Sequence, residues 1–135
     1  QLNVDAIVDK AGSGGSNVKM ANTSTYVSEG GNVTQNTVQG LTKAWLKHHS
    51  GTAAVLDSFN HSSTSDIGTG RTQCNLTNAM SSANNSCTGS DEAGAALISN
   101  QVTMTTSTYS SDHFSLGGSF QDASRCSTQM TGDLA

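Results

Sequence analysis

The chain has 135 residues, about the size of one domain, and its 6 Lys and Arg against 10 Asp and Glu give a net charge of -4. This balance excludes nucleic acid as an expected partner, because neutralising phosphates needs clustered basic side chains. No apolar run approaches the roughly 20 residues that span a bilayer, so membrane insertion is not expected either. Only 12% of the residues are charged, whereas Ser and Thr contribute 21 and 17 residues, a composition typical of a polar β-protein.

The N-terminal segment QLNVDAIV alternates apolar and polar side chains. In an extended strand this alternation places Leu2, Val4, Ala6 and Val8 on one face. The segment KAGSGGS that follows, residues 10–16, has the composition of a flexible tether. A strand on such a tether could leave the body of its own domain, and the alternative is an ordinary first strand that folds at home.

The rest of the chain predicts short strands separated by turns. We therefore divide the chain into a donor-type strand at 1–9, a tether at 10–16 and a single β-sandwich domain at 17–135. Within this domain residues 17–40 are polar and predict short strands and loops. Later strands are expected at 41–49, 52–59, 71–80, 95–109 and 127–130, and loops at 61–70 and 81–86. About seven to nine short strands at turn-punctuated intervals favour an all-β fold, either a β-sandwich or a jelly roll.

One polar stretch contains the residue types of a hydrolase site, namely Asp57, Ser58, His61 and Asp66. A nucleophilic Ser needs a base and an orienting acid brought together from rigid elements, and no GxSxG elbow is present. Asp and Ser also tighten turns through their own side chains, and we assign them that role. The acidic pair Asp91–Glu92 is expected to be a solvated surface. The sequence thus predicts no enzyme.

Metal ligands are not expected from the histidine and cysteine spacing. The four histidines show no i+2 or i+4 pairing, and they are His48, His49, His61 and His113. The three cysteines show no CxxC spacing, and they are Cys74, Cys87 and Cys126. Three buried thiols or one disulfide are both compatible with this count. We expect neither a metal nor a cofactor.

Five N-x-S/T sequons permit N-glycosylation without requiring it. They begin at Asn22, Asn32, Asn60, Asn75 and Asn84.

An ordered set of short motifs resembles a known type of virion protein. The motifs are KAGSG (10–14), VQGLTKAW (38–45), SGT (50–52), DSFNHSSTSDIGTG (57–70), NAM (78–80) and GDLA (132–135). Together they resemble a module of phage tail-fibre and related virion-associated proteins, over most of the chain and most densely at 42–80. The resemblance implies a β-sandwich subunit of an extracellular or virion fibre, with no catalytic residues to carry over.

The chain departs from this family at positions where the family has aromatic or aliphatic residues and where we expect inward-facing side chains. These positions are Lys47, His48, Thr72, Cys74 and Cys87. Such substitutions would leave the core short of apolar volume.

The leading functional hypothesis is a structural filament subunit. The strand carrying Leu2, Val4, Ala6 and Val8 would insert into the neighbouring copy and give a head-to-tail homopolymer. The alternative is a glycan- or receptor-binding domain of a phage tail fibre. The chain opens on Gln1 rather than Met, which indicates a processed or truncated start, and we expect an extracellular or virion protein.

In the glycan-binding alternative, Trp45, Tyr26 or Tyr109 would stack on a cell-surface sugar. We expect Trp45 to belong to the core instead. A glycan depolymerase ranks below both, because no credible site with paired carboxylates is visible.

Overall fold

The computed structural model describes residues 25–27, 34–37, 40–91, 97–99 and 104–133. The predicted donor strand (Leu2, Val4, Ala6 and Val8) and the tether at 10–16 lie outside these ranges. The chain divides into two compact units, Gln1–Val38 and Gln39–Ala135. In the first, β1 (Thr25–Val27) pairs antiparallel with β2 (Thr34–Asn36).

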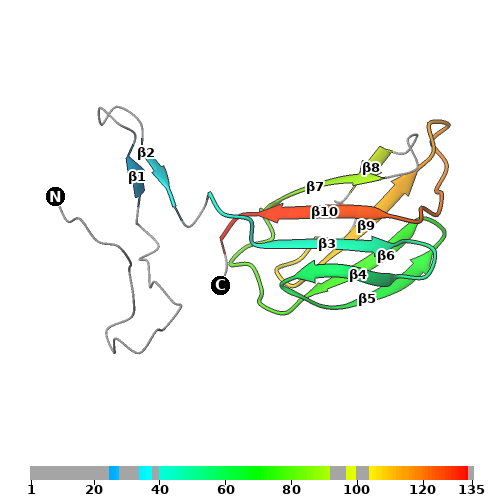
Figure 1. Ribbon diagram of the computed structural model, residues 1–135, viewed down its shortest axis with the longest axis horizontal. Coiled ribbons are helices and arrows are strands. Elements are labelled where there is room, and N and C mark those ends of the chain that lie inside the picture. Colours follow the sequence, from blue (N-terminus) through cyan, green and yellow to red (C-terminus); the bar gives the residue numbers. More distant parts are fainter. Residues whose placement is uncertain (1–24, 28–33, 38–39, 92–96, 100–103, 134–135) are drawn as a thin grey trace. The chain divides into compact units, whose positions relative to one another are not determined.

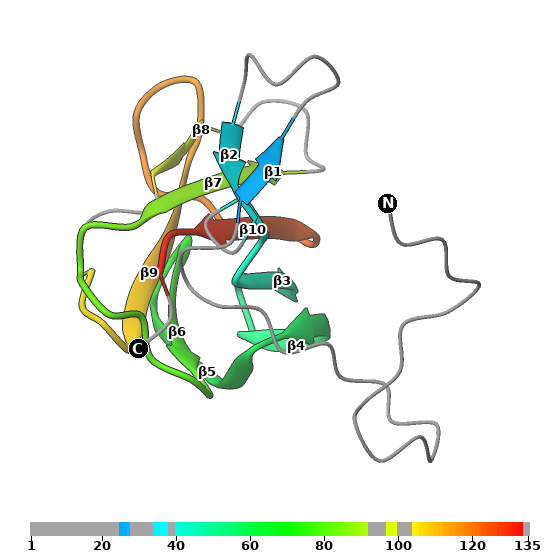
Figure 2. The same cartoon turned by 90° about the vertical axis from the view of Figure 1, so that its left-hand side faces the viewer.

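The second unit is a β-sandwich of two four-stranded antiparallel sheets (Figures 1 and 2). The first sheet has the order β4-β3-β10-β7 and contains β3 (Ala44–His49), β4 (Ala54–Phe59), β7 (Ser86–Asp91) and β10 (Cys126–Thr131). The second has the order β5-β6-β9-β8 and contains β5 (His61–Gly68), β6 (Arg71–Leu76), β8 (Leu97–Ser99) and β9 (Thr108–Phe114). The prediction of an all-β sandwich is confirmed.

Alternating burial explains why these segments form the two facing layers. On β3 the side chains of Ala44, Leu46 and His48 are buried and those between them are exposed. Strands β6 and β10 alternate in the same way. Successive side chains of a strand point to opposite faces, so the buried set of each strand meets the other sheet.

The interior changes in composition along the strands. At one end it is apolar, with a cluster formed by Ala44, Leu46, Cys74, Leu76, Met80, Tyr109 and Met130. At the other end the fully buried side chains are polar and include His48, Thr72, Ser111 and His113. The expectation of an inward-facing side chain is therefore correct for His48, Thr72 and Cys74. It is wrong for Lys47, which alternates outward, while Cys87 is half-buried.

Two predicted loops differ from the structure. Residues 61–68 form β5, although they were predicted as a turn-rich connection. Their side chains are mostly exposed, so the strand has no apolar alternation to reveal it. Strand β7 escaped prediction for the same reason, because SCTGSD reads as turn chemistry. The long strand expected at 95–109 is instead β8 and β9, with Met104–Ser107 outside any strand.

The edge strand β4 carries a β-bulge. Lys47 pairs with Asp57 and His48 with Val55, so Leu56 is the extra residue. Immediately after β4, Asn60 adopts a positive φ of 61°, and the chain passes to β5 in the other sheet. Among the residues described, no helix has the length and apolarity needed to cross a membrane.

Candidate functional site

The structure separates the residues of the predicted hydrolase-like stretch. The Asp57 carboxylate accepts a hydrogen bond from the Ser58 backbone N–H at 2.8 Å, and the Asp66 carboxylate accepts one from Gly68 at 2.9 Å. Both ring nitrogens of His61 are used in structural contacts. Nδ1 lies 3.0 Å from the Phe59 carbonyl oxygen, and Nε2 lies 2.8 Å from the Tyr109 hydroxyl. These contacts are local turn and packing chemistry, and they do not bring Ser58, His61 and Asp66 together.

A second candidate is the outer face of the first sheet. Trp45 pairs with Phe59 on one side and with Gln129 on the other, so the three side chains share one cross-strand row. Trp45 is 37% exposed and Phe59 is 52% exposed. A shallow hollow of about 370 Å³ lies beside this row, lined by Trp45, Lys47, Thr88, Ser90, Ser127 and Gln129 among others. The expectation that Trp45 is a core residue is thus wrong.

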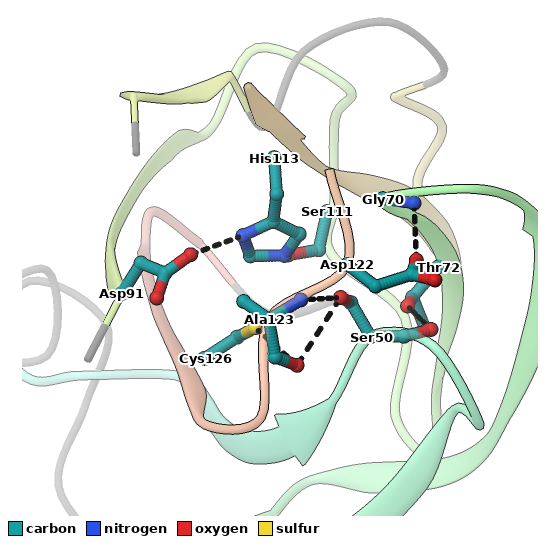
Figure 3. Close-up of polar contacts among 9 residues, drawn as sticks. All are labelled: Ser50, Gly70, Thr72, Asp91, Ser111, His113, Asp122, Ala123 and Cys126. Carbon is teal, nitrogen blue, oxygen red and sulfur yellow. Dashed lines mark hydrogen bonds and ion pairs between the residues drawn. The ribbon is translucent and has the colours of Figure 1, made fainter. Parts of the chain in front are cut away.

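The third candidate is buried at the polar end of the sandwich. His48 on β3 is the register partner of Cys126 on β10, and Cys126 is the register partner of Asp91 on β7. The three side chains therefore form one row on the inner face of the first sheet. His113 on β9 points at this row from the opposite sheet (Figure 3). Donor atoms of His48, His113 and Cys126 all lie within 4.8 Å of one another.

Hydrogen bonds fix the orientation of the His113 ring. Its Nε2 lies 3.0 Å from the Ser111 hydroxyl, and its Nδ1 lies 3.6 Å from Oδ2 of Asp91 (Figure 3). Burial lowers the pKa of His113, and the neighbouring Asp91 opposes this effect without overcoming it. The ring is then neutral at physiological pH, so its contact with Asp91 is not an ion pair.

His48 lies opposite, in a drier environment. Its ring centroid is 5.8 Å from that of His113, and burial is the main cause that lowers its pKa to about 4. Burial likewise raises the pKa of the Cys126 thiol to about 11. At neutral pH both imidazoles are therefore uncharged and the Cys126 thiol is protonated.

A network around Ser50 holds the surrounding backbone in place. The Ala123 N–H donates to the Ser50 hydroxyl at 2.7 Å, and the Ser50 N–H donates to the Ala123 carbonyl at 3.0 Å. The Gly70 N–H donates to the Asp122 carboxylate at 2.6 Å (Figure 3). A Cβ at Gly70 would meet the Gln121 backbone at 2.6 Å, so this close approach requires glycine. The loop before β10 is thereby pinned against the turns that flank β3 and β6.

Ser111, His113 and Asp91 contact one another in the order of a hydrolytic triad, but no substrate can reach them. The Ser111 and His113 side chains are 0% exposed, and a nucleophile must reach the bond it attacks. What the cluster offers instead is a set of nitrogen, sulfur and oxygen donors. The prediction that Asp91 lies on a solvated surface is wrong, since its side chain is 1% exposed.

Other predicted site residues have plain locations. Tyr109 is buried and its hydroxyl lies 2.7 Å from that of Thr128, so it cannot stack on a sugar, while Tyr26 lies on β1. The three cysteines are free thiols, with Cys74 and Cys126 buried and Cys87 half-buried. His49 lies at the end of β3 and is half-buried.

The sequons differ in whether the asparagine amide group is engaged in hydrogen bonds within the protein. Asn22 and Asn32 lie outside the described residues. The Asn60 amide donates two hydrogen bonds, to the carbonyl oxygens of Lys43 and Asn78, and the Asn75 amide donates to the Ser63 hydroxyl at 2.9 Å. Asn84 is exposed in the loop before β7.

The fold and its buried cluster define an all-β sandwich with a polar, donor-rich interior end. Comparison of the chain with family models, with curated protein sequences and with solved structures found no match in any of the three.

Proposed function

We propose that the protein is a structural subunit of an extracellular or virion filament, in which the N-terminal strand of one copy adds to the edge strand β4 of the next. One observation carries this proposal. β4 lies at the edge of its sheet with Val55 45% exposed and Leu56 and Phe59 each 52% exposed. An exposed apolar edge strand is a template for pairing with another chain.

The division of the chain supports the same assignment. All eight described strands of the sandwich come from residues 44–131, and residues 1–38 belong to a separate unit. The eight described strands account for both sheets of the sandwich, and we propose that the N-terminal strand adds to a neighbouring copy. That strand alternates Leu2, Val4, Ala6 and Val8, the pattern by which an added strand uses its backbone for affinity and alternate side chains for specificity. Because donor strand and acceptor edge are different surfaces, each addition leaves a new edge, and an open filament results.

The test compares the full chain with donor and acceptor variants by electron microscopy and analytical ultracentrifugation. The donor variant is Leu2→Asp with Val4→Asp, and its matched control is Asn3→Asp on the opposite face of the strand. The acceptor variant is Val55→Lys on β4, and its control is Ile67→Lys, which sits on the edge strand β5 and is 43% exposed. We expect filaments to vanish in the donor and acceptor variants and to persist in both controls.

A chain lacking residues 1–9 should give soluble particles that bind a peptide of sequence QLNVDAIVD. Unchanged assemblies in the deletion, or equal loss of assembly in Val55→Lys and Ile67→Lys, would rule out addition at β4.

A second function, recognition of a cell-surface glycan, is favoured by the outer face around Trp45. Aromatic rings beside hydrogen-bonding side chains are what sugar recognition requires, and Trp45 and Phe59 here lie in one row with Gln129. The Gln129 amide donates to the Thr42 hydroxyl at 2.7 Å, which holds it beside Trp45. The resemblance to tail-fibre modules agrees with this function as well as with the first.

Tryptophan fluorescence tests this second function directly, because Trp45 is the only Trp in the chain. Titration with a panel of oligosaccharides should shift the emission if a sugar stacks on this face, and Phe59→Ala should weaken the response more than Leu116→Ala, a 76% exposed side chain outside the row. A flat titration across the panel would remove glycan binding at Trp45 from consideration.

A further inference from the structure

The polar end of the sandwich brings four side chains with metal-binding donor atoms together from four strands. His48 on β3, Cys126 on β10 and Asp91 on β7 are successive register partners in one sheet, and His113 comes from β9 in the other. No two of these residues are closer than 13 positions in the sequence, as Cys126 and His113 are. Only the pairing of the strands creates the cluster.

The His48 ring makes this end of the interior costly as it stands. Both of its ring nitrogens are buried, and neither has a hydrogen-bond partner within the part of the chain that the structure describes. A buried polar group without a partner costs about 1–3 kcal/mol. The same ring belongs to the group of three side chains whose donor atoms lie within 4.8 Å of one another. The lone pair of the His48 ring lies among other electron-pair donors. A metal cation accepts electron pairs and would therefore satisfy it.

We propose that His48, His113, Cys126 and Asp91 bind a zinc ion that ties the two sheets together at the polar end of the sandwich. Two imidazole nitrogens, one sulfur and one carboxylate oxygen form a four-ligand set of the kind that zinc accepts. Zinc–ligand bonds of about 2.0–2.3 Å place tetrahedral ligand atoms about 3.3–3.8 Å apart. The 3.6 Å between Nδ1 of His113 and Oδ2 of Asp91 lies in that range. The donor atoms of His48, His113 and Cys126 are separated by up to 4.8 Å, so these three side chains must move inward by about 1 Å, and Asp91, which contacts His113, must move with them to complete the set.

The surroundings of His113 prepare it as a ligand. Its Nε2 lies 3.0 Å from the Ser111 hydroxyl, and in the tautomer whose Nε2–H donates to that hydroxyl the lone pair is on Nδ1, the nitrogen that faces Asp91. Metal binding would select this tautomer. Metal-bound histidines regularly donate their other ring N–H in this way, because the hydrogen bond fixes the tautomer and the ring orientation. Ser111 is itself 0% exposed, so this orientation is shielded from water.

The charges of the proposed site balance. On binding, the Cys126 thiol releases its proton to solvent and the thiolate donates an electron pair to the ion, while the two neutral imidazoles bind without losing a proton. The double positive charge then meets one thiolate and one carboxylate, so the buried site has no net charge. Burial of an uncompensated charge would be prohibitive, whereas this set avoids it. Four protein ligands close the coordination sphere, so the ion's role is structural.

The experiment uses the full chain produced with zinc chloride in the medium. We expect about one zinc per chain by elemental mass spectrometry after gel filtration. Exchange for cobalt should give a thiolate-to-cobalt charge-transfer band, a sign of sulfur ligation that a surface-bound ion lacks. Chelation should lower the melting temperature, and added zinc chloride should restore it. The site does not depend on filament formation, so the measurement stands whether or not the chain assembles.

Matched variants assign the ligands. Cys126→Ser should abolish the charge-transfer band and weaken zinc binding at least ~100-fold, more than loss of a supporting residue would. Cys74→Ser, which alters another fully buried thiol, should keep the charge-transfer band and the wild-type affinity for zinc. His48→Gln should weaken binding, and His49→Gln should not. Zinc retained by Cys126→Ser, or wild-type protein that binds no zinc and melts identically with and without chelator, would each overturn the proposal.

Discussion

Asn60 is the corner at which the chain leaves one sheet for the other, and its replacement gives a sharp test of the fold. The residue has a φ of 61°, a left-handed conformation that Asn tolerates better than most residues. Its amide nitrogen donates to the Lys43 carbonyl at 3.0 Å and to the Asn78 carbonyl at 3.2 Å. Its side-chain oxygen accepts from the Asn78 backbone N–H at 2.7 Å and from the Asn78 amide at 3.1 Å. The corner is therefore held to two other segments.

These contacts set the size of the expected loss in the free energy of unfolding when Asn60 is replaced. Four hydrogen bonds close to solvent contribute about 0.5–1 kcal/mol each, so their joint loss costs about 2–4 kcal/mol. Asn60→Gly keeps the backbone conformation and loses only the hydrogen bonds. Asn60→Ala loses the same hydrogen bonds, and Ala tolerates the left-handed region less well than Asn or Gly, which adds about 1 kcal/mol. We expect free energies of unfolding lower by about 2–4 kcal/mol for Gly and about 3–5 kcal/mol for Ala, a large share of the stability of a small domain.

Urea unfolding measures both values. Fluorescence of the half-exposed Trp45 and far-ultraviolet circular dichroism should give coincident transitions, the condition for a two-state analysis. Asn84→Ala, an exposed loop asparagine, is the control and should change the unfolding free energy by less than about 0.5 kcal/mol. A loss below 1 kcal/mol for Asn60→Ala, or a Gly variant less stable than the Ala variant, would refute this account of the corner.

Three further predictions concern glycosylation, thiol reactivity and acid stability. In a glycosylating host Asn84 should carry a glycan more often than Asn60, whose amide is already committed to two carbonyl groups, and glycopeptide mass spectrometry showing full occupancy at Asn60 would contradict this. Burial raises the pKa of Cys74 to about 12, so at pH 8 only about one thiol in ten thousand is ionised, and alkylation should occur only as the protein unfolds. Rapid native-state labelling of Cys74 would show the prediction to be wrong. In chelator-treated protein, the pKa of His48 is about 4 in the folded state and 6.5 in the unfolded state. As the pH falls, the unfolded chain therefore takes up a proton at His48 before the folded protein does. Stability should be fully present above pH 6.5 and fall by up to about 3 kcal/mol as the pH drops through about 4, with a smaller fall in His48→Gln. Urea midpoints with equal pH dependence in both proteins would exclude His48 as the cause.

The sequence predicts those strands whose burial alternates. β3 and β10 fall within or beside the segments expected at 41–49 and 127–130, because one face of each packs against the opposite sheet. β5 is not predicted, since both of its faces are largely exposed and its Ser and Thr residues give no period. Local patterns report burial, and a strand that buries little leaves little trace.

The candidate metal ligands could be predicted only in part. The resemblance to tail-fibre modules predicts that His48 faces inward, which is correct, but the same argument places Lys47 inward as well, and that side chain is exposed. The convergence of His48 with Cys126 and His113 was not expected, because it depends on β3 pairing with β10 and on β9 lying opposite. Register between distant strands is set by the whole fold, so no local spacing of histidines or cysteines could reveal it.

The uneven interior links the two proposals. At the apolar end, burial of side chains such as Leu46 and Met130 stabilises the sandwich. Around His48 little apolar area is buried, so hydrogen bonds and the proposed ion must supply the stability there. The turn at Ser50–Ala53 begins at this polar end and leads directly into β4, the proposed acceptor edge. Loss of the ion should therefore loosen the edge that receives the neighbouring strand before it unfolds the rest of the domain, since proteins open first where local stability is lowest.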